Sequence, residues 1–335
     1  MDLRTQYLGL SLRSPLVASA GPLTGTLDGI RRLASAGVGA VVLPSLFEEQ
    51  LRNEAEQDFL LAEAHADSNF EALSYLPSVA EDGPGRYLSL ISRAVEATGI
   101  PVIASLNGVS PGDWTDSAFA IEQAGASAIE LNIYYLPGDS LIPARDAERR
   151  YTEVLTTVKA AVSIPVAVKL SPYFSSIGEM AMVLDRAGAD GLVLFSRFLQ
   201  NDIDPETFTV STGFRLSVPA EGALPRAWIS RLRGVVRCSL AATTGVETAD
   251  DVAAYLLAGA DVVMSTSALL RHGPGYARVL LDGLQAWMDR MGFTSVAQVR
   301  GLLTKAADGG PAYGRAGYLR AIEQATHGPY HSKVT

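Results

Sequence analysis

The sequence has almost no cysteine, few histidines and no excess of positive charge, and each shortage excludes a class of protein. Its single cysteine, Cys238, excludes an internal disulfide and an iron–sulfur cluster held by cysteines. The four histidines are scattered without metal-ligand spacing, so we expect no metal site. The net charge of -9 argues against a nucleic-acid or anionic-membrane partner and favours a small-molecule substrate.

Long apolar stretches and a secretion signal are also missing. Glycine or charge interrupts every apolar stretch before it reaches membrane-spanning length, and residues 1–7 lack a basic-then-apolar signal. We therefore expect a cytoplasmic protein with no membrane partner. With 335 residues and 48% hydrophobic content, the chain is near the size of one barrel domain with insertions.

One sequence pattern occurs four times: an Ala-Gly pair that leads into a short apolar strand, beginning at Ala36, Ala124, Ala187 and Ala258. Glycine just past a helix end takes the left-handed backbone conformation without steric cost. A strand that is apolar on consecutive residues needs cover on both faces. The pattern therefore predicts repeated helix, turn and buried parallel strand, as in a (β/α)8 barrel or a doubly wound sheet, where chemistry lies at the strand ends.

The number of candidate strands favours the α/β barrel. We expect strands at residues 16–20, 40–43, 102–106, 128–132, 166–170, 191–195, 239–242 and 262–264. Helical periodicity is found at residues 27–36, 114–124, 147–162, 177–187, 249–258 and 274–291. A hairpin of residues 3–7 and 10–12 is expected to plug the barrel floor, and the long connections 45–100 and 196–236 are expected to form mouth loops. The barrel domain would span residues 1–303, with a helix at 295–303, and a tail would span 304–335.

Polar residues follow several predicted strands at the active end of such a barrel. Asn132 closes one apolar strand and fits either a ligand contact or a turn cap. Lys169 follows three apolar strand residues, where burial is costly unless an anion meets it, so we expect a functional role. Small residues at 243–245 and 265–268 fit either an anion pocket or ordinary helix caps.

Five stretches, in this order, resemble the dihydroorotate dehydrogenase family, with similarity from about Leu3 to Leu303. They are residues 16–21 (LVASAG), 130–132 (ELN), 168–172 (VKLSP), 244–248 (TGVET) and 267–269 (SAL). The resemblance implies an FMN-dependent (β/α)8 oxidoreductase that acts on CH–CH groups and forms a homodimer. It implies that FMN lies beside Ala18, Ser19 and Ala20, is hydrogen-bonded by Asn132 and Lys169, and rests its phosphate on the backbone of Thr244, Gly245, Thr266 and Ser267.

The substrate half of the family's site is altered. The family's catalytic base, a cysteine or serine shortly after the strand-four asparagine, falls at Tyr135, and the proline–asparagine that follows it becomes residues 136–137 (LP). The lysine expected after strand two is replaced within residues 43–45 (LPS), and a loop asparagine is missing from residues 72–78. The flavin half of the site is therefore retained, while the orotate half is not.

Arg197 follows the sixth strand, where the family has a substrate-binding asparagine region. A guanidinium at the mouth needs an anionic partner, which is either a substrate group or a loop carboxylate such as Asp202 or Glu206. The leading hypothesis is an FMN oxidoreductase with a substrate other than dihydroorotate, in which Tyr135 or Tyr134 serves as acid or base. Alternatives are a Schiff-base lyase that uses Lys169 on a phosphate-bearing substrate, and a non-catalytic flavin protein that serves a redox partner.

Overall fold

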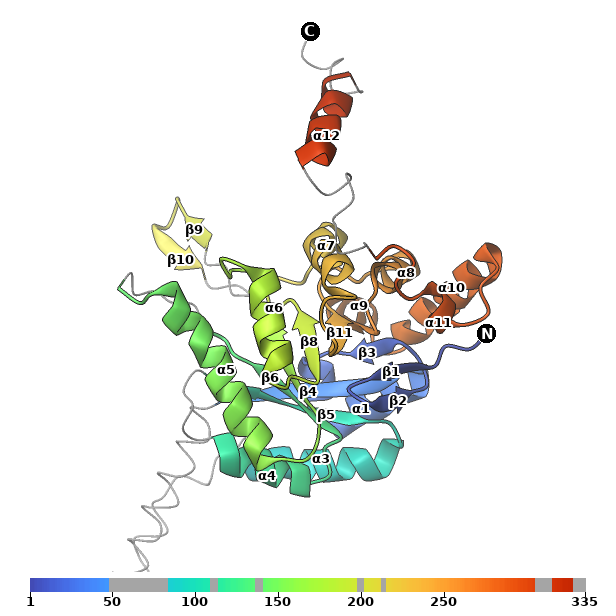
Figure 1. Ribbon diagram of the computed structural model, residues 1–335. Coiled ribbons are helices and arrows are strands. Elements are labelled where there is room, and N and C mark those ends of the chain that lie inside the picture. Colours follow the sequence, from blue (N-terminus) through green and yellow to red (C-terminus); the bar gives the residue numbers. More distant parts are fainter. Residues whose placement is uncertain are drawn as a thin grey trace, which may run out of the picture.

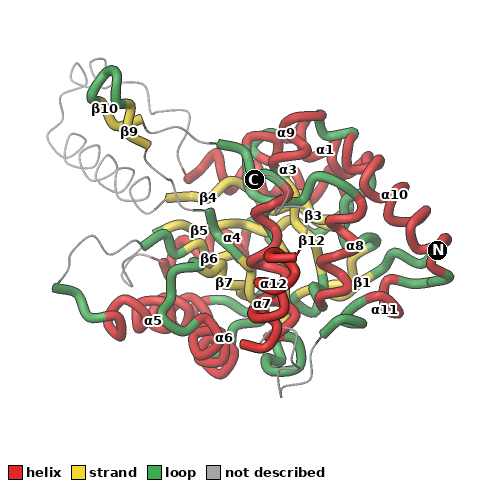
Figure 2. The backbone as a smooth tube through the Cα atoms, turned by 90° about the horizontal axis from the view of Figure 1, so that it is seen from above, coloured by secondary structure: helices red, strands yellow, loops and turns green. Residues whose placement is uncertain are grey.

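Eight parallel strands close into a barrel, because the first barrel strand pairs with the last (Figures 1 and 2). The computed structural model describes residues 1–47, 84–108, 114–135, 141–197, 202–211, 215–304 and 315–327. In spatial order the barrel strands are β11 (Ser239–Ala242), β12 (Val262–Ser265), β3 (Leu16–Ala18), β4 (Ala40–Phe47), β5 (Val102–Asn107), β6 (Ala128–Asn132), β7 (Val166–Leu170) and β8 (Gly191–Leu194). The predicted (β/α)8 fold is confirmed.

Helices follow the strands and surround the barrel (Figure 2). The glycine of each Ala-Gly pair has a positive φ, which is 104° at Gly37, 94° at Gly125, 94° at Gly188 and 111° at Gly259. The left-handed turns expected from the sequence are thus confirmed. The helices are α1 (Leu27–Ala36), α3 (Pro84–Thr98), α4 (Trp114–Gln123), α5 (Ala144–Ala161), α6 (Ile177–Arg186), α7 (Ala223–Leu232), α8 (Ala249–Ala258), α9 (Ser267–His272), α10 (Tyr276–Met291) and α11 (Val296–Val299).

Two apolar layers lie on opposite faces of the barrel sheet. The outer layer joins strands to helices and includes Leu131 of β6 and Leu155 of α5. The inner layer fills the barrel and includes Ala167 of β7 and Val193 of β8. Because successive side chains of a strand point to opposite faces, residues that share a face with Ala167 or Val193 point toward the barrel axis.

The amino-terminal hairpin closes one end of the barrel, as the sequence predicted. It consists of β1 (Thr5–Tyr7) and β2 (Leu10–Leu12), which pair antiparallel. Tyr7 and Leu8 are buried and belong to the inner layer, and the Leu8 amide donates a hydrogen bond of 3.0 Å to Oγ of Ser239. Ser239 is the first residue of β11. The hairpin therefore blocks the amino-terminal end of the strands and leaves the carboxyl-terminal end for a ligand.

The long connections contain regular structure that the sequence analysis missed. α3 and α7 lie within them, and β9 (Asp202–Asp204) pairs with β10 (Thr209–Ser211) in a small hairpin. The helix expected at 295–303 ends at Val299, because Gly301 takes a φ of 80° and the chain turns. The tail contains α12 (Arg315–His327), which stands away from the barrel in Figure 1.

The described ranges contain neither a membrane-spanning helix nor a cluster of metal-binding side chains. No helix there is both long and apolar enough to cross a bilayer. In the same ranges no group of three or more His, Cys, Asp or Glu side chains is arranged to hold a metal ion.

Candidate functional site

A cavity of about 460 Å³ opens at the carboxyl-terminal ends of the barrel strands. This volume lies within the range of small-molecule and cofactor sites, and the position is the active end of a (β/α)8 barrel. The cavity is lined by most of the residues singled out from the sequence. They are Ser19, Ala20, Asn132, Lys169, Arg197, Thr244, Gly245, Thr266 and Ser267.

Lys169 meets a buried carboxylate at the base of the cavity. Glu130 of β6 and Lys169 of β7 lie on the inward faces of adjacent strands, and Nζ of Lys169 is 3.3 Å from Oε1 of Glu130. The side chains are 12% and 1% exposed. The anionic partner that a buried lysine requires is thus Glu130, a residue of the barrel itself. No role was predicted for Glu130 from the sequence. Oε2 of Glu130 has no hydrogen-bond partner among the described residues.

Asn132 is oriented by a neighbouring hydroxyl. Oγ of Ser196 donates to Oδ1 of Asn132 at 3.1 Å, which leaves the asparagine NH2 group as the donor available to a ligand. Asn107 of β5 pairs in register with Asn132, and both side chains line the cavity. The side chains of Asn107 and Ser19 line the cavity, and each residue is only 6% exposed. Polar groups at a largely enclosed cavity wall favour a ligand that offers them hydrogen bonds.

The loop after β11 forms a tight backbone cradle. Thr244 has a φ of 80° and Gly245 a φ of 70°. A Cβ on Gly245 would lie 2.6 Å from the backbone nitrogen of Gly222, so only glycine fits there. The hydroxyl of Tyr255 donates to the Thr244 carbonyl at 2.6 Å and holds the loop from behind. Successive turns of this kind present backbone N–H groups to an anion.

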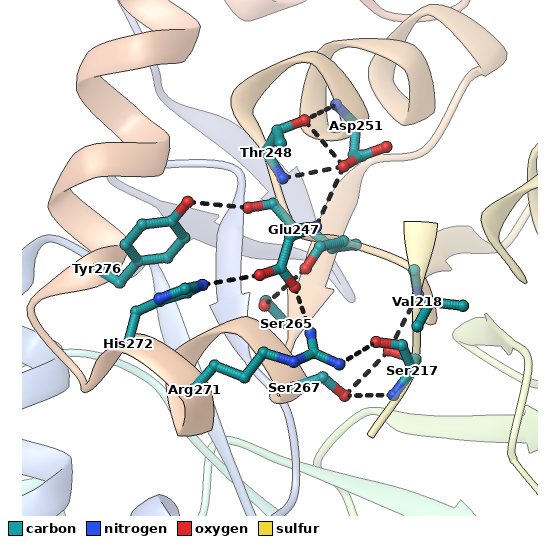
Figure 3. A network of polar contacts seen from close by, with 12 residues as sticks. Ser217, Val218, Glu247, Thr248, Asp251, Ser265, Ser267, Arg271, His272 and Tyr276 are labelled. Atoms are coloured by element: carbon teal, nitrogen blue, oxygen red, sulfur yellow. Dashed lines mark hydrogen bonds and ion pairs between the residues drawn. The ribbon is translucent and has the colours of Figure 1, made fainter. Parts of the chain in front are cut away.

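A polar network supports this end of the cavity (Figure 3). The carboxylate of Glu247 pairs with Arg271 and lies 2.8 Å from Nε2 of His272. Arg271 also donates to the Ser217 carbonyl at 2.7 Å, and the Ser217 amide donates to Oγ of Ser267 at 3.0 Å. The Gly245 amide donates to Oγ of Ser217 at 3.3 Å. Ser217, which no sequence signal indicated, therefore lies directly against the two predicted phosphate loops.

Arg197 is held by a loop carboxylate. Its Nε is 2.9 Å from Oε2 of Glu221 and its Nη2 is 3.3 Å from Oε1, and Nη1 donates to the Arg215 carbonyl. Of the two expected roles, a loop ion pair is the one present, but the partner is Glu221. Asp202, one of the two suggested partners, instead pairs with Arg215 at 3.0 Å.

Two predicted residues lie outside the cavity. Ala18 belongs to the outer apolar layer, because it alternates along β3 with Val17, which belongs to the inner layer. Tyr135 lines a separate, smaller pocket, and the Arg150 guanidinium lies 4.3 Å from its ring centroid. Tyr134 lines the main cavity, so the geometry favours Tyr134 over Tyr135 as the tyrosine that reaches a ligand. Residues 72–78 and 136–137, where the family pattern is broken, lie outside the described residues.

Further cavity residues were not singled out from the sequence. Ser45 and Asn107 line the cavity, and Oγ of Ser45 is 2.8 Å from Oγ of Ser105. The signal for the β5 residues was present, since Ser105 and Asn107 are alternate polar residues in an otherwise apolar strand. The β4–β5 register shifts between Val42 and Ser45, which the sequence pattern did not reveal.

Comparisons with known proteins agree with the geometry. The family described as Dihydroorotate dehydrogenase matches residues 2–288. The chain is 28% identical to the catalytic subunit of dihydroorotate dehydrogenase B (NAD(+)) of Methanothermobacter thermautotrophicus, over 90% of this chain and 98% of the relative. It is 25% identical to the protein of the same name from Pyrococcus furiosus, over 91% of this chain and 100% of the relative. The chain therefore belongs to the dihydroorotate dehydrogenase family.

Proposed function

We propose that this protein is an FMN-dependent oxidoreductase that acts on CH–CH groups of a substrate other than dihydroorotate. The observation that supports it most is the set of polar groups around the cavity: Lys169 and Asn132 lie on adjacent strands, and Asn107 and Ser19 line the same cavity. When bound, FMN supplies hydride transfer, and the protein binds it, orients it and presents the substrate.

The residues present fit FMN. The side chain of Lys169, the NH2 group of Asn132 and the amide of Asn107 offer donors and an acceptor to a flavin ring. The Thr244–Gly245 turn lines the cavity, and Gly245 lets this loop pack closely against the backbone of Gly222. Thr266 and Ser267 line the cavity beside it. These residues would hold the ring and the phosphate, respectively.

The substrate half differs from the family's pattern. Ser45 lines the cavity where the family's lysine is expected, and its hydroxyl pairs with Ser105. No cysteine or serine follows Asn132 at the position of the family's base, and Tyr134 is the residue proposed to move a proton there. These replacements remove the groups that recognise dihydroorotate, which supports a different substrate.

The Schiff-base alternative is less well supported. A Schiff base would require Nζ of Lys169 to leave its ion pair with Glu130, whose Oε1 is 3.3 Å away. The alternative of a non-catalytic flavin protein shares the FMN site. It differs from the proposal only in whether a small molecule reduces or reoxidises the bound flavin.

The test is the visible spectrum of the pure protein, followed by identification of the released flavin. We expect bound, noncovalent FMN, and we expect Lys169→Ala to weaken FMN binding measured by titration of the apoprotein. Lys159→Ala is the matched control. Nζ of Lys159 is 2.7 Å from Oδ2 of Asp190, and neither residue lines the cavity. A colourless protein that takes up no FMN at micromolar concentration would refute the proposal.

A further inference from the structure

Among the described residues that line the cavity, the cationic side chains are Lys169 and Arg197, and both are paired with carboxylates. Lys169 faces Glu130, and Arg197 uses Nε and Nη2 on Glu221 while Nη1 donates to a backbone carbonyl. The lining residues themselves include no Asp or Glu, so the described wall of the cavity and its ion partners sum to no net charge.

The Arg197–Glu221 pair is built into the loop that bears it. Oε1 of Glu221 also accepts a hydrogen bond of 3.0 Å from the Val218 amide. Glu221 therefore fixes both the guanidinium and the loop around Ser217, and a substrate carboxylate would have to compete with it. The two side chains are 30% and 35% exposed, so a ligand carboxylate that displaced Glu221 would exchange one carboxylate for another and gain no additional cation.

The other polar side chains that the structure describes at the cavity wall are uncharged. Ser45, Ser196 and Asn132 offer hydroxyl and amide groups, and Phe195 and Tyr134 add aromatic surface. Groups of this kind recognise carbonyl, amide and hydroxyl functions of a ligand. A carboxylate would lose its hydration without gaining an unpaired cation, and the phosphate of FMN would add further negative charge to the cavity.

We propose that the substrate is an uncharged molecule that carries carbonyl, amide or hydroxyl groups next to its reacting CH–CH bond. This inference rests on the proposed FMN function, because it concerns the ligand that shares the cavity with the flavin. It reverses the expectation from the sequence that Arg197 holds an anionic substrate group. In this arrangement Arg197 shapes the wall and the Glu221 carboxylate excludes anions.

The test compares matched ligands on the FMN-loaded full chain, by titration calorimetry and by the change in the flavin spectrum. Uracil and orotate share a ring and differ by one carboxylate, and fumaramide and fumarate share an alkene and differ in charge. We expect the uncharged member of at least one pair to bind at least tenfold more tightly than its carboxylate partner.

A variant separates charge from shape. Glu221→Gln keeps an oxygen acceptor for Arg197 but removes the negative charge, so carboxylate ligands should gain about tenfold in affinity while uncharged ligands change less than twofold. Glu153→Gln is the matched control, since it removes a carboxylate from the Arg149–Glu153 pair on the surface of α5. It should change neither affinity.

Each outcome decides the inference. Equal or tighter binding of orotate or fumarate to the parent protein would overturn it, as would the absence of binding by all four ligands to a protein that retains FMN. In those cases the FMN function would stand. Failure to bind FMN itself would overturn the proposed function and this inference together.

Discussion

Replacing Lys169 by methionine should destabilise the ligand-free protein far more than replacing a surface lysine. The substitution leaves the carboxylate of Glu130, 1% exposed, buried without its cation, and one of its oxygens already lacks a partner. Removing one member of a buried ion pair costs about 3–5 kcal/mol. At roughly 2 °C per kcal/mol for a chain of this size, the Tm should fall by about 6–10 °C.

The assay is thermal and urea unfolding of the flavin-free protein, with two comparisons. Lys159→Met removes the same charge from a pair whose side chains are 31% and 34% exposed, so its cost should be about 1 kcal/mol or less. The double variant Glu130→Gln/Lys169→Met should recover most of the lost stability, because no unpaired charge stays buried. A single variant that melts within about 2 °C of the parent, or a double variant no more stable than the single one, would refute the reasoning.

Three further predictions concern the loops and the chemistry. Tyr255→Phe removes the 2.6 Å hydrogen bond to Thr244, worth about 1 kcal/mol, and should weaken FMN binding roughly three- to tenfold in a fluorescence titration; an unchanged affinity would contradict the cradle's role. Dihydroorotate should bleach the flavin anaerobically at least about 100-fold more slowly than in a relative with a cysteine or serine base, and equal rates would show that the base is not needed. Gly39→Ala should lower the free energy of unfolding in urea by about 1–3 kcal/mol, because the new Cβ would lie 2.2 Å from the Ser14 carbonyl oxygen. Gly85→Ala should not destabilise the protein, because no atom lies within 4 Å of its Cβ position. Similar unfolding free energies for the two variants would count against the steric argument.

The fold was predictable because local signals and tertiary structure agree. The repeated Ala-Gly pairs end helices in the left-handed conformation, and the strands that follow them are buried on both faces. α3 was missed although Tyr87, Ile91 and Ala94 show helical spacing, because it lies at the end of a long connection that was assigned as loop. α7 was missed for the same reason.

The candidate site was predictable only where it lies on strands. Asn132 ends β6 and Lys169 is the last but one residue of β7, and alternation fixes the face on which each side chain lies. Glu221 and Ser217 come from a connection whose path depends on packing against other loops. Sequence spacing carries no information about that path, so only the structure identifies Glu221 as the partner of Arg197.

The pairing of β3 with β12 also affects how the protein is made. The ribosome delivers Leu16 early and Val262 late, so through most of synthesis β3 has one open edge and its apolar faces lack part of their cover. Unpaired strand edges are templates for association with other chains. A nascent chain released before Val262 leaves open edges on β3 and β11, so truncation products of this protein should aggregate rather than retain part of the site.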